Sequence, residues 1–197
     1  MSSSRSGTRD NRYDGFLVVF AMAVIMWVSE VIDTVADHHL DRYGIEPRDV
    51  DGLTGIIAAP FLHAGFGHLA ANTVPFLVMV FVIAFKGAMR VAAVTVIVAL
   101  VSGVGTWLVA PANTVHIGAS GVVFGYATYL LSRGFFERDL LGLAIGVVVG
   151  ALWGTALLGG LLPQEGISWQ GHLFGAIGGV LAARVLARPR EERAAAT

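Results

Sequence analysis

Three separate parts of the sequence begin an apolar run with a residue that can do nucleophilic or acid–base chemistry. Ser120 lies two residues after Gly118 in a Gly-Ala-Ser-Gly turn, His172 begins the last run, and His68 is followed one helical turn later by Asn72. Polar groups at membrane depth are costly and therefore indicate function. If the three starts share one side of a membrane, a nucleophile, a base and two hydrogen-bond donors meet there.

The chemistry that these residue types favour is acyl transfer through a serine. A histidine with a pKa near 6.5 can take the serine proton during attack and return it to a leaving amine. Because Ser120 opens its helix, backbone N–H groups at that terminus can stabilise an oxyanion, and His68 and Asn72 can add hydrogen bonds. The sequence shows no acid near His172, so we expect a dyad and not a triad.

The composition predicts an all-α membrane protein. Hydrophobic residues make up 55% of the 197 residues and charged residues 14%, against about 25% charged residues in a soluble domain. The apolar residues gather in runs that approach the length of about 20 residues that a membrane helix needs. We expect six such helices, over residues 15–36, 68–85, 91–110, 117–132, 140–160 and 170–187.

The charges between these runs predict the orientation. Eleven of the thirteen Lys and Arg residues fall in the two terminal segments or in the second and fourth loops, and the other two are Arg42 and Arg48. Basic residues favour the cytoplasmic side, so both termini are expected there. The net charge of −1 gives no reason to expect nucleic-acid binding, and the absence of cysteine excludes disulfides and thiolate metal sites.

The predicted organisation is one membrane domain between two short cytoplasmic tails. Residues 1–14 form a disordered tail, residues 15–187 the six-helix domain, and residues 188–197 a second tail. The first apolar run should remain as an anchor, because no small-residue cleavage site follows it. The long connection after it contains an apolar stretch, 53–62, that is too short to span and suits an irregular interfacial segment.

Glycines supply the close approach that the proposed chemistry needs. Gly121 and Gly125 are four residues apart, as are Gly171, Gly175 and Gly179. Small residues at this spacing let membrane helices pack backbone to backbone, which would bring the serine turn and the last helix together.

Other polar residues have simpler interpretations. We expect His63 to hold the first loop by a hydrogen bond and His116 to be a solvated loop residue. Glu30 and Asp33, near the end of the first run, should face the interface or bond to the first loop.

At these residues the chain resembles the rhomboid intramembrane serine proteases. Residues 63–72 match the family's His-x4-His-x3-Asn, residues 118–121 its Gly-x-Ser-Gly, and residues 172–175 its His-x-x-Gly. The motifs stand in family order, and the resemblance covers about residues 15–187. The Trp-Arg pair found in the first loop of many relatives has no match here.

The resemblance implies a role for each matching position. Ser120 is the nucleophile and His172 the base, and His68, Asn72 and the Ser120 N–H form the oxyanion hole. Phe124 is implied to pack on the catalytic histidine. The supporting positions in these motifs and the turn are His63, Gly118, Gly121, Phe124 and Gly175.

The resemblance also implies a partner and a place in the cell. Its substrates are transmembrane proteins cleaved in or near their membrane segment, with the lipid bilayer as surroundings and without a cofactor or metal. A bacterial plasma membrane is expected, with the site opening to the outer face and movement of the fifth helix and its following loop as the gate. The sequence gives no expectation for the oligomeric state.

Two other classes of protein remain as alternatives. One is a catalytically silent protein of the same fold that binds membrane clients. The other is a small transporter or metal-binding membrane protein that uses His63, His68 and His172, although no carboxylate accompanies them at ligand spacing. His38 and His39 could bind a metal weakly as a pair.

Overall fold

The computed structural model describes residues 4–187, and the side chains of residues 12–187, as a bundle of helices. The short helices of the first loop are the 3-10 turns Asp41–Tyr43, Asp51–Thr54 and Ala59–Phe61 and the α-helix α2, Gly55–Ala58. The long helices are α1 (Ser4–Val35), α3 (Phe66–Ala84), α4 (Ala88–Val109), α5 (Ser120–Glu137), α6 (Leu140–Gly160) and α7 (Trp169–Val185).

Five of the long helices begin and end within five residues of the predicted runs. The largest of these differences is at α5, which was predicted over 117–132 and runs from Ser120 to Glu137. It starts later because Gly118 has a φ of 114°, outside helical geometry. It ends later because Arg133 and Glu137 form an ion pair of 3.2 Å one turn apart, which keeps two charged residues helical.

Helix α1 begins well before the predicted start of its run. It starts at Ser4, so most of the N-terminal tail predicted as disordered over residues 1–14 is helical. Once the apolar run has formed a helix, each further residue adds a hydrogen bond without a new nucleation cost. The predicted C-terminal tail, 188–197, lies outside the described residues.

Four helices are long and apolar enough to cross a membrane by length and composition. These are the segment Arg12–Val35 of α1 and the helices α3, α4 and α6. Helices α5 and α7 have 18 and 17 residues and are not among them. Length and composition therefore support four of the six predicted spans.

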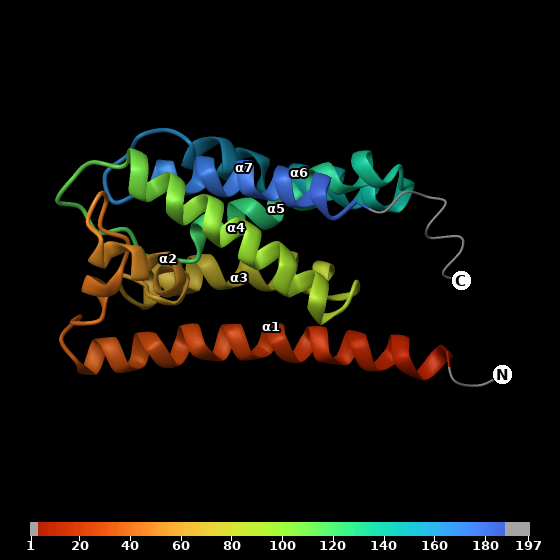
Figure 1. The fold of residues 1–197 in the computed structure, drawn as a ribbon, viewed down its shortest axis with the longest axis horizontal. Helices are drawn as coiled ribbons and strands as arrows, with labels where there is room; N and C mark the ends of the chain where they lie inside the picture. Colours follow the sequence, from red (N-terminus) through yellow and green to blue (C-terminus); the bar gives the residue numbers. More distant parts are fainter. Residues whose placement is uncertain (1–3, 188–197) are drawn as a thin grey trace.

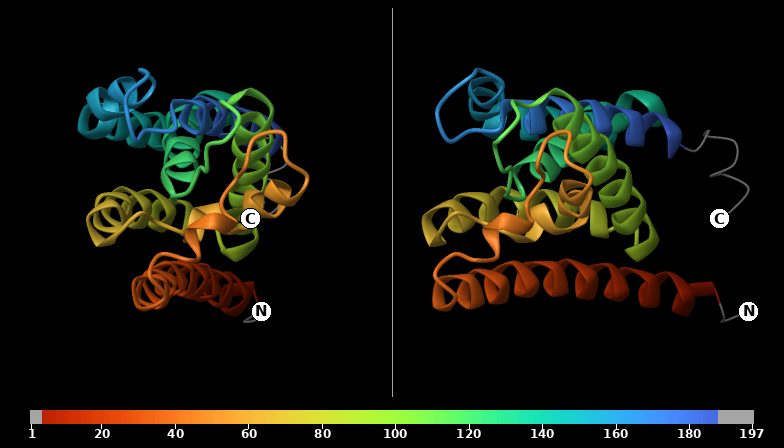
Figure 2. Two further views of the ribbon diagram at one scale, coloured as in Figure 1. Left: turned by 90° about the vertical axis from the view of Figure 1, so that its left-hand side faces the viewer. Right: turned by 60° about the vertical axis from the view of Figure 1, so that its left-hand side comes forward.

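The helices form layers, and α5 lies in the middle of the bundle between α3, α4, α6 and α7. Helix α1 lies along one side of the molecule against α3 and α4, while α5, α6 and α7 form the opposite side (Figures 1 and 2). Helix α5 contacts α3, α4, α6 and α7 and supplies two of the largest fully buried side chains, Tyr126 and Tyr129. The first residues of α1 and the last of α7 lie at one end of the molecule, and the first loop lies at the other (Figure 1).

Candidate active site

Ser120 is the first residue of α5, directly after a turn that only glycine can make easily. Gly118 has a φ of 114°, and a Cβ there would lie 2.7 Å from Cε1 of His68. The backbone N–H of Gly118 donates to the Ala59 carbonyl at 2.8 Å, and that of Ala119 donates to Nε2 of His63 at 3.3 Å. The first loop therefore holds the backbone that presents Ser120.

His172, in the first turns of α7, contacts Ser120 directly. Its Nε2 lies 2.8 Å from Ser120 Oγ, and its Nδ1 lies 2.7 Å from the carbonyl oxygen of Gly160. A carbonyl only accepts, so Nδ1 carries the proton and Nε2 is free to accept the serine hydroxyl. The ring also stacks on Phe124, with centroids 4.1 Å apart and an interplanar angle of 7°.

The Gly160 carbonyl occupies the place that a carboxylate holds in a catalytic triad. Gly160 ends α6, and a Cβ there would lie 2.6 Å from Cζ of Phe124 and 3.0 Å from Nδ1 of His172. The sequence analysis did not find this residue. The only signal for it is a glycine at the end of an apolar run, which is too common to point to a site.

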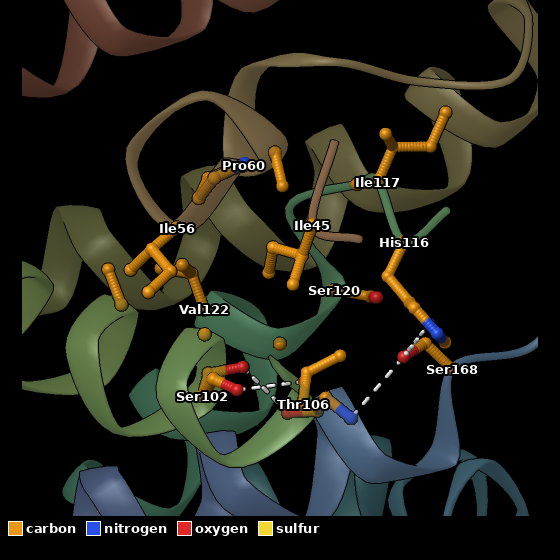
Figure 3. Close-up of a pocket in the computed structure, with 16 residues that line it drawn as sticks. Ile45, Ile56, Pro60, Ser102, Thr106, His116, Ile117, Ser120, Val122 and Ser168 are labelled. Atoms are coloured by element: carbon orange, nitrogen blue, oxygen red, sulfur yellow. Dashed lines mark hydrogen bonds between the residues drawn. The ribbon is translucent and has the colours of Figure 1, made fainter. Parts of the chain in front are cut away.

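Helix α7 begins with a hydrogen-bonded cap that also reaches the third loop. Ser168 precedes the helix and its hydroxyl accepts from the Gly171 N–H at 3.4 Å. The same hydroxyl lies 2.7 Å from Nδ1 of His116 (Figure 3), and Nε2 of His116 lies 2.9 Å from Thr114 Oγ1. The expectation that His116 is solvated was wrong: it is half-buried, and burial lowers its pKa.

His68 and Asn72 lie on the neighbouring face of α3, facing the serine turn. The Ala64 N–H points at Nδ1 of His68 at 3.4 Å, which favours a proton on Nε2, beside Gly118. The Asn72 side chain is buried and donates from Nδ2 to the His68 carbonyl at 3.0 Å. The Nε2–H of His68 and the second Nδ2–H of Asn72 can therefore serve as hydrogen-bond donors in the site.

His63 has a structural position, as expected. It is 1% exposed, its Nε2 accepts from Ala119, and its ring meets that of His68 edge to face at 5.2 Å. Burial, with the positive charge that His68 can carry, lowers the pKa of His63 to about 4. A lowered pKa means that the ring is neutral at neutral pH, and a neutral ring can accept the Ala119 N–H at Nε2.

The glycine stripes of α5 and α7 pack against each other, as predicted. A Cβ at Gly175 would overlap the carbonyl oxygen of Gly121, and one at Gly179 would overlap that of Gly125. Ser102 on α4 donates to the Gly171 carbonyl at 2.8 Å and so fixes the start of α7 from a third helix. The sequence analysis did not single out Ser102, since hydroxyl residues are common in packed helices.

An open cleft leads to these residues. Its volume is about 910 Å³, and its walls include His68, Asn72, Ser120 and His172 together with Gln164 and Glu165 of the loop after α6. A second, much smaller cavity of about 30 Å³ also borders Ser120, among first-loop residues, Ser102 and Thr106 (Figure 3).

The histidines of the metal-binding alternative do not form a ligand set in the part of the chain that the structure describes. His172 uses both ring nitrogens on Ser120 and Gly160, and Nε2 of His63 faces a backbone N–H. In the pair His38 and His39, Nδ1 of His39 bonds to the Ala36 carbonyl, so this nitrogen is already used.

Comparison with known proteins identifies the family. A rhomboid domain model matches residues 51–189. An uncharacterized protein of Mycobacterium tuberculosis is 41% identical over 186 residues, which is 90% of this chain and 78% of that protein. A candidate rhomboid protease of Bacillus subtilis is 30% identical over 141 residues, 70% of this chain and 69% of that protein. The chain is therefore an integral membrane protein of the rhomboid family.

Proposed function

We propose that this protein is an intramembrane serine endopeptidase that cleaves transmembrane proteins with a Ser120–His172 dyad. The observation that carries the proposal is the 2.8 Å contact between His172 Nε2 and Ser120 Oγ, with the Gly160 carbonyl on the opposite ring nitrogen. A hydroxyl paired with a base, whose tautomer a third group fixes, is the arrangement that activates a nucleophile.

In the first step the Ser120 hydroxyl attacks the carbonyl carbon of the scissile peptide bond. Its proton passes to Nε2 of His172, and the resulting imidazolium is stabilised by its Nδ1–H bond to Gly160. The tetrahedral intermediate collapses as His172 gives that proton to the leaving amine, which breaks the C–N bond. A water molecule then hydrolyses the acyl-enzyme by the same route in reverse.

The oxyanion of each intermediate would lie between the start of α5 and α3. The Ser120 N–H belongs to the first turn of its helix, where amides lack a carbonyl partner within the helix. His68 and Asn72 add side-chain donors from the same cleft. Removing one such donor typically lowers kcat by about 10²–10³-fold, so the three together supply a large part of the rate.

The substrate and topology follow from the same proposal. The membrane domain comprises residues 15–187 and crosses the bilayer six times, with α5 and α7 as the two shortest spans. Both termini lie in the cytoplasm of a bacterial cell, and the cleft opens to the outer face. The apolar, membrane-long helices around the site favour a transmembrane segment as substrate, entering beside α6, which packs mainly on α5.

The test is cleavage of a single-span model protein by the purified chain in detergent. Ser120→Ala and His172→Ala should each lower the rate by about 10³-fold or more, while Ser132→Ala, on the same helix, should leave it unchanged. Cleavage that survives in either dyad variant would exclude the proposal. Folded wild type that binds the model protein without cutting it would favour the client-binding alternative.

A further inference from the structure

A cluster of metal-ligating side chains lies where α1 ends and the first loop begins, away from the dyad. Asp33, His38 and Asp41 each place a ligand atom within 4.8 Å of the other two. His38 Nδ1 lies 3.1 Å from Asp33 Oδ2, and the Leu40 N–H donates to Asp33 Oδ1 at 2.6 Å. The chain turns back on itself here (Figure 1), which brings three residues from two sides of the turn together.

Glu30 is a third carboxylate beside this cluster and the fourth side chain that could donate to a metal. It lies one turn before Asp33 on the same face of α1, is 1% exposed, and interacts electrostatically with Asp33, His38 and Asp41. The backbone N–H of Gly65 approaches the Glu30 carboxylate, but neither carboxylate oxygen has a hydrogen-bond partner of good geometry within the described residues, and the same holds for Oδ1 of Asp41. The sequence analysis expected Glu30 and Asp33 to face the interface or bond to the first loop; Asp33 bonds to the loop, and both are buried.

The cluster lacks a permanent positive charge. Among residues 12–187, no Lys or Arg forms an ion pair with Glu30, Asp33 or Asp41, and His38 is the single basic partner. Buried carboxylates are normally paired or bound to metal. The end of a helix also disfavours negative charge, since the helix dipole is negative there.

We propose that Asp33, His38 and Asp41, with Glu30 as a fourth donor, bind one divalent transition-metal ion such as Zn²⁺. Carboxylate oxygens with an imidazole nitrogen suit zinc, whereas Ca²⁺ takes oxygen ligands. With bonds of about 2.1 Å, two ligand atoms on one ion are about 3.4 Å apart, whereas the atoms of Asp33, His38 and Asp41 lie within 4.8 Å of one another, so the side chains would move together when the ion binds. The bound ion would fix the start of the first loop to α1.

Zinc binding is measured on the full chain, stripped of metal and carrying an affinity tag without histidines. Isothermal titration calorimetry and elemental analysis should show one Zn²⁺ per chain, and zinc at 100 times its Kd should raise the melting temperature by about 5 °C or more. The double variant Asp33→Asn/Asp41→Asn should bind at least about 100-fold more weakly. The matched control is His39→Ala, which removes the neighbouring histidine outside the cluster and should bind as the wild type does.

His38→Ala is the second variant, chosen because the His38 side chain is 52% exposed and its removal leaves little empty space in the core. This variant should also lose tight binding. His68→Ala should keep it, which separates the cluster from the cleft histidines. Zinc binding that survives in the His38 and double variants, or a wild type that takes up no zinc, would overturn the proposal, and so would a preference for Ca²⁺ over Zn²⁺. None of these results depends on proteolysis.

Discussion

His172 is held on three sides by groups that fix both its position and its tautomer. Ser120 lies at one ring nitrogen, the Gly160 carbonyl at the other, and Phe124 stacks on the ring face. The position of Gly160 leaves no room for a side chain, because a Cβ would meet both Phe124 and His172. The geometry of the dyad thus depends on a residue that has no reactive group of its own.

Gly160→Ala should lower kcat by about tenfold to 10²-fold without unfolding the protein, because small displacements of a catalytic group cost rate steeply. The matched control is Gly159→Ala, where a Cβ meets nothing within 4 Å. Both variants are compared by substrate cleavage and by melting temperature. Equal activity in the two variants would show that the contact of Gly160 with the ring is unimportant.

His63 makes stability depend on pH. Its folded-state pKa of about 4 lies below the ordinary value of 6.5, so its contribution is complete above pH 6.5 and is lost as the pH falls toward 4. The loss at pH 5 is about 2 kcal/mol for one such group. His63→Gln keeps an acceptor for Ala119 but does not titrate, and its unfolding free energy should fall less between pH 7.5 and 5. The same fall in both proteins would contradict this assignment.

At the scale of the helices, close packing of α5 on α7 brings the serine and the histidine together. The glycine spacing predicted this contact, and the structure confirms it at Gly121, Gly125, Gly175 and Gly179. The spacing could not predict that another helix, α4, also contacts the start of α7. Ser102 of α4 bonds to the start of α7 through a single hydroxyl, and no periodic pattern marks such a residue.

Gly175→Ala should destabilise the protein by about 1–3 kcal/mol, because its Cβ would overlap a backbone oxygen that cannot move aside. Gly154→Ala on α6 is the control, since a Cβ there meets nothing within 4 Å and alanine favours the helix. Unfolding of both variants in a denaturing detergent gives the comparison. A Gly175→Ala protein as stable as the control would mean that the two helices do not pack this closely.

At the scale of the whole molecule, the two ends of the bundle carry different sets of charged residues. The candidate site and the acidic first loop lie at one end, while Lys86, Arg90 and Arg133 meet Glu137 at the other. The sequence predicted the helices closely because long apolar runs have few alternatives to a helix. It did not predict the helical start of α1 or the partners of His116, which depend on contacts between distant segments.

The proposed orientation can be tested with single cysteines, because the chain contains none of its own. Asp51→Cys and Glu165→Cys lie in exposed loops at the site end, and Arg138→Cys is exposed at the opposite end. A membrane-impermeant maleimide applied to intact cells should label the first two and not the third, while lysed cells should show labelling of all three. The reverse pattern would place the termini outside and overturn the topology.

The central claim is that Ser120 is a nucleophile activated by His172, and a fluorophosphonate probe tests this without a known substrate. Folded wild-type protein in detergent should form one adduct, located on Ser120 by mass spectrometry. The adduct should disappear in Ser120→Ala, fall by at least about 10³-fold in rate in His172→Ala, and persist in Ser132→Ala. Folded wild type that forms no adduct, or an adduct whose rate is independent of His172, would contradict the account.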